Sequence, residues 1–70
     1  MENFKFELYT NSIYQMFWVM YDISRVCLKS KLDFNSTQNF TLMIIYDSDL
    51  SYEQIETILL DNDVNYNLVD

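Results

Sequence analysis

The sequence predicts an α+β fold in one domain, residues 1–70, with the order strand, helix, strand, strand, helix, strand. Four segments alternate apolar and polar residues or are rich in β-branched and aromatic residues, as strands are. Between them, two segments repeat apolar residues at helical spacing, and each follows a Ser-x-x-Gln capping box that marks a helix start. Half of the residues are apolar, which is enough for a core without a disulfide or a metal.

The first predicted strand covers residues 4–9. Its side chains alternate between two faces, with Phe4, Phe6 and Leu8 on one face and Lys5, Glu7 and Tyr9 on the other. A period of two is typical of a strand that buries one face. We expect the face with the two phenylalanines to lie against the core.

The first predicted helix covers residues 13–29 and begins after the capping pair Ser12 and Gln15. An apolar stripe at helical spacing is expected to pack on the sheet: Ile13, Met16, Phe17, Met20, Cys27 and Leu28. A second stripe of large aromatic residues lies beside it: Tyr14, Trp18 and Tyr21. Only a narrow polar line remains: Gln15, Asp22, Arg25 and Lys29. The helix is therefore apolar on nearly all sides.

Residues 30–35 and 40–47 are predicted to form a hairpin across a polar turn, residues 35–39. In the alternative, residues 30–39 are a loop, which leaves three strands and two helices. The second segment has few polar residues and is expected to be a central strand. One set of its residues is expected to face the helices: Phe40, Leu42, Ile44 and Tyr46. The other set, with Tyr9, would then point to the open face of the sheet: Thr41, Met43 and Ile45.

The second predicted helix begins at the capping pair Ser51 and Gln54. Its inner face is expected to hold Ile55, Ile58 and Leu59, and its outer face Glu53, Glu56 and Thr57. Asn62 is expected to end it in the left-handed conformation, since the chain has no glycine. A last strand follows, in which Val64, Tyr66 and Leu68 alternate with asparagines.

This order of elements is the split βαβ arrangement of ferredoxin-like domains, an antiparallel sheet with both helices on one face. The stretch MIIYDSDLSYEQIETILLDNDVNYNLV, residues 43–69, resembles the heavy-metal-associated domains, in which a strand leads into a short amphipathic helix and a last strand. That family binds copper-type ions through two cysteines in the loop after the first strand. The matching segment here, residues 9–14, has no cysteine, so the resemblance implies a topology and no metal carriage.

The net charge of −7 arises in the second half of the chain. Residues 1–31 hold four bases and three acids, whereas residues 32–70 hold eight acids and no base. Such a field repels phosphate backbones and attracts basic proteins. Direct binding of nucleic acid is therefore not expected. The longest apolar run, residues 16–21, is far shorter than the roughly 20 residues that span a bilayer, and the start lacks a signal-peptide pattern, so we expect a soluble, cytoplasmic protein.

Three groups of residues carry side chains that could support chemistry: the acids near residue 47, the single cysteine and the acids near residue 61. Asp47 and Asp49, with Glu53 near, carry oxygen ligands that suit a hard cation, but a strand end and a helix start explain the same residues. Cys27 is the only cysteine and the chain has no histidine, so a core position is expected rather than a nucleophile, a disulfide or a zinc site. A pair of acids, Asp61 and Asp63, reads as a solvated helix end. We expect no enzyme and no cofactor.

Two surfaces remain as candidates for partners. The aromatic stripe lacks the flanking bases of a base-stacking platform, whereas tryptophan and tyrosine are enriched in protein interfaces. A loop or a strand edge that covers the stripe is the alternative. The acidic surface is predicted to bind a partner through six carboxylates: Asp47, Asp49, Glu53, Glu56, Asp61 and Asp63.

In size, acidity, lack of motif and richness in Asn, Ile and Tyr, the chain resembles small phage-encoded inhibitors, such as anti-CRISPR proteins and inhibitors that mimic DNA charge. The resemblance implies a non-enzymatic inhibitor whose acidic surface blocks a basic, nucleic-acid-handling protein. The alternative is a small self-assembling regulatory or structural domain. In either case we expect a homodimer, because one sheet face lacks a covering layer. The dimer surface is either this open sheet face, with Tyr9, Met43 and Ile45, or the aromatic stripe. We expect the first helix, with Trp18 near its centre, rather than the second helix to form the contact with a self or foreign partner.

Overall fold

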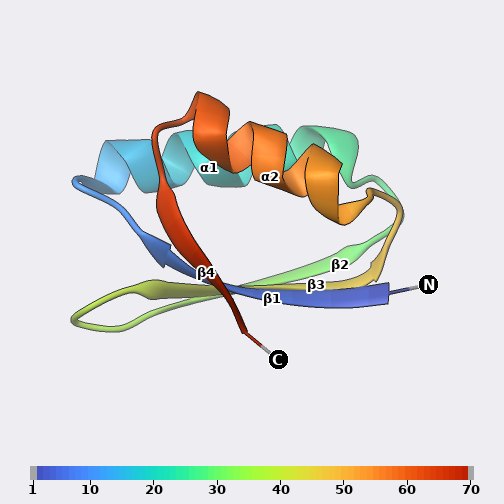
Figure 1. Ribbon diagram of the computed structural model, residues 1–70, viewed down its shortest axis with the longest axis horizontal. Coiled ribbons are helices and arrows are strands. Elements are labelled where there is room, and N and C mark those ends of the chain that lie inside the picture. Colours follow the sequence, from blue (N-terminus) through green and yellow to red (C-terminus); the bar gives the residue numbers. More distant parts are fainter. Residues whose placement is uncertain (1, 70) are drawn as a thin grey trace.

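The computed structural model describes residues 2–69 and contains four strands and two helices (Figure 1). Their bounds are β1 (Glu2–Tyr9), α1 (Ile13–Val26), β2 (Lys31–Ser36), β3 (Thr41–Ser48), α2 (Tyr52–Asp61) and β4 (Asn65–Val69). The predicted order of elements is confirmed. Because residues 31–36 form a strand, the loop alternative for this region is wrong. Within residues 2–69, no helix is both long enough and apolar enough to cross a membrane.

The four strands form one sheet in the order β2-β3-β1-β4, and every neighbouring pair is antiparallel. Both helices lie on the same face of this sheet, as Figure 1 shows. The fold is therefore a two-layer α+β arrangement with one open sheet face. The two central strands, β1 and β3, form the floor on which the helices pack.

The core lies between the sheet and the helices and is one cluster of buried side chains. The predicted inner face of β1 is confirmed, since Phe4, Phe6 and Leu8 are buried. On β3 the predicted faces are wrong. Met43 and Ile45 are fully buried toward the helices, and Thr41 is buried with them.

The pairing register explains this correction. Residues directly opposite each other in an antiparallel pair point to the same face. Phe6 lies opposite Met43, so the buried face of β1 fixes the buried face of β3. The residues that were expected to face the helices on β3 instead lie on the open face, half-buried: Leu42, Ile44 and Tyr46. Phe40 precedes the strand, in the turn after β2.

The core-facing side of α1 also differs from the prediction. Met16, Val19 and Ile23 are its buried residues, followed by Cys27 at the helix end. Three members of the predicted inner stripe are exposed: Ile13, Phe17 and Leu28. The helix ends at Val26, earlier than expected, where the Cys27 N–H still donates to the carbonyl of Ile23.

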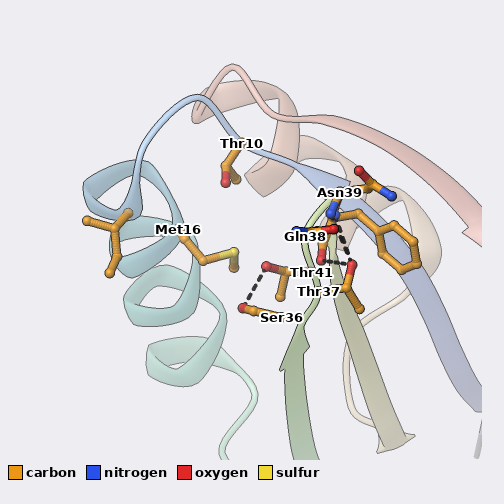
Figure 2. Close-up of a pocket in the computed structure, with 9 residues that line it drawn as sticks. Thr10, Met16, Ser36, Thr37, Gln38, Asn39 and Thr41 are labelled. Atoms are coloured by element: carbon orange, nitrogen blue, oxygen red, sulfur yellow. Dashed lines mark hydrogen bonds between the residues drawn. The ribbon is translucent and has the colours of Figure 1, made fainter.

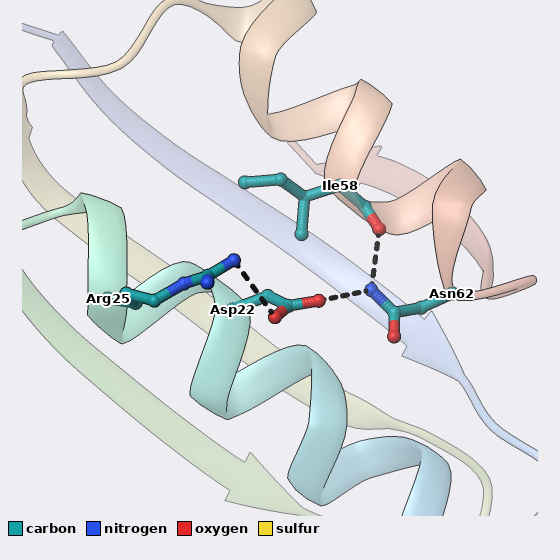
Figure 3. A network of polar contacts seen from close by, with 4 residues as sticks. All are labelled: Asp22, Arg25, Ile58 and Asn62. Atoms are coloured by element: carbon teal, nitrogen blue, oxygen red, sulfur yellow. Dashed lines mark hydrogen bonds and ion pairs between the residues drawn. The ribbon is translucent and has the colours of Figure 1, made fainter.

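Polar residues decide which apolar side of α1 faces the sheet. The Gln15 amide Nε2 donates to the backbone carbonyls of Asn62 (2.9 Å) and Asp63 (3.0 Å), at the end of α2. Asp22 accepts a hydrogen bond of 3.0 Å from Nδ2 of Asn62, as Figure 3 shows, and pairs with Arg25 at 3.6 Å. These bonds form only when the predicted polar line meets α2. That rotation places Val19 and its neighbours on the sheet.

The capping glutamines at the starts of α1 and α2 make different hydrogen bonds. In α2 the capping box is complete: the Gln54 N–H donates to Oγ of Ser51 (3.3 Å), and Oε1 of Gln54 accepts from the Ser51 N–H (2.8 Å). In α1 only the first half forms, at 3.2 Å from the Gln15 N–H to Oγ of Ser12. Oε1 of Gln15 accepts instead from the Asn11 N–H (2.7 Å). The capping glutamine of α1 therefore serves the contact between the helices.

The end of α2 corrects one further prediction. Asn62 keeps a negative φ of −97°, and the left-handed residue is Asp63, with φ of 56°. The Asn62 side chain donates both to the Ile58 carbonyl (2.9 Å) and to Asp22 (Figure 3). Because this side chain is held in the helix end, the next residue makes the reversal. Asp47, at the end of β3, is the other described residue with positive φ, at 51°.

Candidate functional site

The outer side of α1 carries an aromatic face, which we define as Tyr14, Phe17, Trp18 and Tyr21. Each of these side chains is between 55% and 74% exposed. The predicted stripe of three aromatic residues therefore faces solvent, and no described loop or strand covers it. Phe17 was missed as a member because its spacing also fitted the expected inner stripe. Its position one turn before Tyr21 was the available signal.

The side chains of the aromatic face contact one another. The rings of Trp18 and Tyr21 meet edge to face with centroids 6.0 Å apart. The Arg25 guanidinium lies 5.6 Å from the centroid of the Tyr21 ring. Phe17, Trp18 and Tyr21 also line a shallow open hollow. Aromatic rings around such a hollow provide apolar area with few rotatable bonds, as protein interfaces do.

The six carboxylates of the predicted acidic surface fall into three settings. Glu53 lies in the first turn of α2, and Asp47 lies at the end of β3, the strand that precedes this helix. Both residues are exposed. Asp61 and Asp63 are exposed at the other end of α2, about 12 Å further along the helix axis. These four carboxylates have no ion-pair partner among residues 2–69. The remaining two, Asp49 and Glu56, are held inside the protein's own hydrogen bonds.

Asp49 ties two loops together. Its carboxylate accepts from the Ser30 hydroxyl (2.6 Å) and from the Lys29 N–H (3.4 Å), which follow α1. The Ser30 hydrogen bond, more than any other effect, lowers the pKa of the Asp49 carboxyl below its usual value. Its charge is therefore partly used to hold the loop before β2 against the loop before α2.

Glu56 does not face water as predicted. It is half-buried, and its carboxylate accepts from the hydroxyls of Tyr52 (3.2 Å) and Tyr66. The hydrogen bond to Glu56, followed by burial, raises the pKa of the Tyr66 hydroxyl. Tyr66 belongs to β4, so this bond joins α2 to an edge strand of the sheet. The residue is a structural tie rather than a free surface charge.

The residues that the sequence offered for catalysis or metal binding do not come together in one site. Cys27 is buried, and its burial, with the nearby charge of Asp49, raises the pKa of its thiol. A raised pKa leaves little thiolate, which is the nucleophilic form. Among residues 2–69, no three His, Cys, Asp or Glu side chains come close enough together to hold a metal ion. Asp47, Asp49 and Glu53, the earlier candidates for a hard cation, therefore do not form such a group.

A hollow of about 230 Å³ lies between the start of α1 and the turn that joins β2 to β3 (Figure 2). Its lining residues are all uncharged: Thr10, Ile13, Met16, Ser36, Thr37, Gln38, Asn39, Phe40 and Thr41. The Ser36 and Thr41 hydroxyls bond to each other at 3.0 Å, and Thr37 caps the turn through the Phe40 carbonyl at 2.9 Å. Without an acid, a base or a thiol, this hollow offers only hydrogen bonds and shape.

The open sheet face mixes apolar and charged residues. Leu42, Ile44 and Tyr46 of β3 lie opposite Glu7, Lys5 and Lys31 on the neighbouring strands. The Lys31 ammonium sits 5.6 Å from the centroid of the Tyr46 ring. Lysine stems cover apolar area while their charges stay in water. This face therefore has less uncovered apolar surface than the aromatic face.

Comparisons of the chain with protein-family models, with curated proteins and with solved structures gave no match.

Proposed function

We propose that this protein is a non-enzymatic inhibitor that binds a basic, nucleic-acid-handling protein through the exposed carboxylates around α2. The observation that carries the proposal is the set of exposed carboxylates at the two ends of α2. Asp47, Glu53, Asp61 and Asp63 are exposed without an ion-pair partner among the described residues. On the opposite, open sheet face, by contrast, the lysines lie among acids: Lys5, Glu7, Lys31 and Asp33. A surface with unpaired carboxylates suits a partner surface that normally receives phosphates.

The structure revises which carboxylates the proposal uses. Asp49 and Glu56 are engaged by Ser30 and Tyr66, so they contribute less to a partner than the sequence suggested. Four carboxylates remain, at the two ends of α2. A partner that spans them would have basic groups spaced along a path of about 15 Å, the length of a ten-residue helix.

The fold that we propose is the ferredoxin-like one. The strand order β2-β3-β1-β4 and the two helices on one face support this assignment. A binding role rather than catalysis is supported by the buried Cys27 and by a hollow lined with uncharged residues. We also propose that the protein acts in the cytoplasm, where an unpaired, buried cysteine stays reduced. The class of small phage-encoded, anti-CRISPR type inhibitors fits these properties.

The proposal is tested by neutralising one surface at a time. The first variant combines Glu53→Gln, Asp61→Asn and Asp63→Asn, whose carboxylates make no hydrogen bond within residues 2–69. Asparagine tolerates the positive φ of Asp63. The matched control combines Glu2→Gln, Glu7→Gln and Asp33→Asn on the strands, so both variants lose three negative charges.

Each protein is used to capture partners from a host-cell lysate, and the captured protein is then challenged with duplex DNA. We expect wild type and control to retain a nucleic-acid-binding protein that DNA displaces. We expect the first variant, with the three substitutions in and after α2, to bind this protein at least about tenfold more weakly at low salt, because it has lost several charges at the rim of the interface. Binding that is equal in both variants, or that salt does not weaken, would refute the proposal.

A second candidate function is a self-assembling regulatory or structural domain with no such target. The observation that favours it is the exposed aromatic face, which the acidic-surface proposal does not use. The lysate experiment separates the two, because a self-assembling domain without such a target would retain no lysate protein, and only the bait itself would be recovered.

A further inference from the structure

The outer side of α1 has the residue spacing of a helix-pairing seam. Tyr14, Trp18, Tyr21 and Arg25 are separated by four, three and four residues. This is the a/d spacing of a coiled coil, in which side chains every 3.5 residues on average meet a second helix. All four side chains point to solvent. Folding of this chain alone does not account for the spacing, because the core uses Met16, Val19 and Ile23.

A second helix can reach this seam without displacing any element. At 3.6 residues per turn, the aromatic face lies opposite the buried side of α1 and roughly a quarter turn from Gln15 and Asp22. Those two residues mark the side that contacts α2. The seam is therefore open along the outer surface of the helical layer, which forms the top of the molecule in Figure 1.

We propose that the aromatic face binds the same face of a second copy, with the two α1 helices antiparallel about a two-fold axis between Trp18 and Tyr21. In this arrangement Trp18 meets Tyr21 of the second copy, and Tyr14 meets Arg25 of the second copy. Both contacts occur twice, as an isologous interface requires. Within one copy, Trp18 and Tyr21 already meet edge to face, and Arg25 already lies over a tyrosine ring.

Charge favours a second copy as the occupant. The single charge on the seam is that of Arg25, which Asp22 balances at 3.6 Å. Two such faces meet with almost no net charge between them, although each copy carries −7. The two-fold arrangement also gives each Arg25 a second aromatic ring, Tyr14 of the other copy, and cation–π contacts strengthen when they are removed from water.

The available area matches a weak to moderate dimer. Aromatic side chains of this kind bury about 150–250 Å² each, so four rings that are more than half exposed provide on the order of 500 Å² per copy. Ile13 and Leu28, both exposed, extend the surface at its two ends. Two copies then reach the low end of specific interfaces, about 1,200 Å² in total. We expect dissociation in the micromolar range.

Sedimentation or light scattering, from about 1 µM to about 500 µM protein, tests the pairing. Wild type should change from monomer to dimer within this range. Trp18→Ala should raise the dissociation constant at least about tenfold, since a central tryptophan is the typical hot spot. The matched control is Leu60→Ala, because Leu60 is also an exposed apolar residue, 59% against 62% for Trp18, but lies on α2. This control should dimerise as wild type does.

Cysteine cross-linking tests the antiparallel arrangement. In a Cys27→Ala background, oxidation of a mixture of Tyr14→Cys and Arg25→Cys proteins should give mostly the mixed disulfide. Tyr14→Cys alone should give little. If Trp18→Ala failed to fold, Tyr14→Ala, at the most exposed aromatic position, would replace it as the probe.

Four results would overturn the proposal. The first three are a wild type that stays monomeric at the highest concentration, a Trp18→Ala protein that dimerises like wild type, and a parallel cross-link pattern. The fourth is capture of a foreign protein through the aromatic face by a strictly monomeric wild type. The test is independent of the acidic surface, since no variant in it changes a carboxylate. Salt separates the two as well: screening should strengthen pairing of two copies that each carry −7 and weaken binding to a basic partner.

Discussion

The two helices cover the same sheet, but their outer sides differ in kind. In α2 the buried Ile55 and Leu59 form a narrow stripe, and the side toward solvent is mainly polar. In α1 a similarly narrow stripe of buried residues faces the sheet, and the side toward solvent is aromatic. The core explains the apolar residues of α2 except Leu60, which is exposed. It explains only about half of those in α1, and the outer half of α1 is the surface that we propose as the dimer contact.

Truncating one residue on each side of α1 should give the largest difference in stability. Ile23→Ala removes a fully buried side chain and should cost about 2–5 kcal/mol of unfolding free energy, enough to threaten a domain of this size. Phe17→Ala, which the sequence alone would rank as a core change, should cost less than about 1 kcal/mol. Urea unfolding followed by circular dichroism measures both. Equal losses would place Phe17 in the core and contradict the structure.

The two capping glutamines provide a second comparison. Gln15→Ala removes three hydrogen bonds, two of which join α1 to the end of α2, and should cost about 1–2 kcal/mol. Gln54→Ala opens the complete capping box of α2 but removes only one exposed side-chain bond, and should cost about 0.5 kcal/mol. Denaturant midpoints give the difference. A larger loss from Gln54→Ala would mean that local capping outweighs the tie between the helices.

The tie between α2 and β4 should appear at alkaline pH. The Tyr66 pKa is raised in the folded protein by the hydrogen bond to Glu56 and by burial, so the folded state holds the phenolic proton more tightly than the unfolded state does. The stability from this proton is complete below the unfolded pKa of about 10 and is lost as pH rises above it. Tyr66→Phe removes this component. Between about pH 8 and about pH 11, the free energy of unfolding should fall less steeply with pH for Tyr66→Phe than for wild type.

The loop contact of Asp49 should give the smallest effect, at the acid end. The Asp49 pKa is lowered, mainly by the Ser30 hydroxyl, so the contribution is present above the unfolded pKa of about 3.9 and lost as pH falls through the lower, folded value. Ser30→Ala should move the midpoint of the Asp49 carboxyl upward in an NMR titration. Glu53, which lacks such a donor, is the internal control. An unchanged Asp49 midpoint would show that the two loops are not joined in solution.

The order of elements could be predicted because its signals are local. Ser12 and Ser51 start helices through bonds to residues three positions ahead, and alternation in β1 needs no knowledge of other strands. The faces of α1 and β3 could not be predicted in the same way. Both sides of each element are apolar, so the choice depends on distant residues: Asn62 for α1 and Phe6 for β3.

Two of the six carboxylates predicted for the acidic surface, Asp49 and Glu56, accept hydrogen bonds within the protein, which the sequence did not indicate for a related reason. Tyr66, which takes up Glu56, lies ten positions away in another element, and Ser30, which takes up Asp49, lies nineteen positions away. Hydrophobic periodicity carries no information about such pairs. The one local signal was Tyr52, four residues before Glu56, whose hydroxyl shares the same carboxylate. Three of the four residues of the aromatic face could be grouped from the sequence because their spacing is a property of one helix, whereas their exposure depends on the rest of the fold.

The two left-handed residues, Asp47 and Asp63, carry a cost that glycine would avoid. A side chain at positive φ is crowded by its own backbone, and aspartate tolerates this less well than glycine. Both residues belong to the unpaired carboxylates near α2. An engineer who sought a more heat-resistant protein would therefore choose these two positions for glycine first. The same choice would remove half of the exposed carboxylates that we propose as the binding surface, so durability and inhibition would be traded against each other at these two residues.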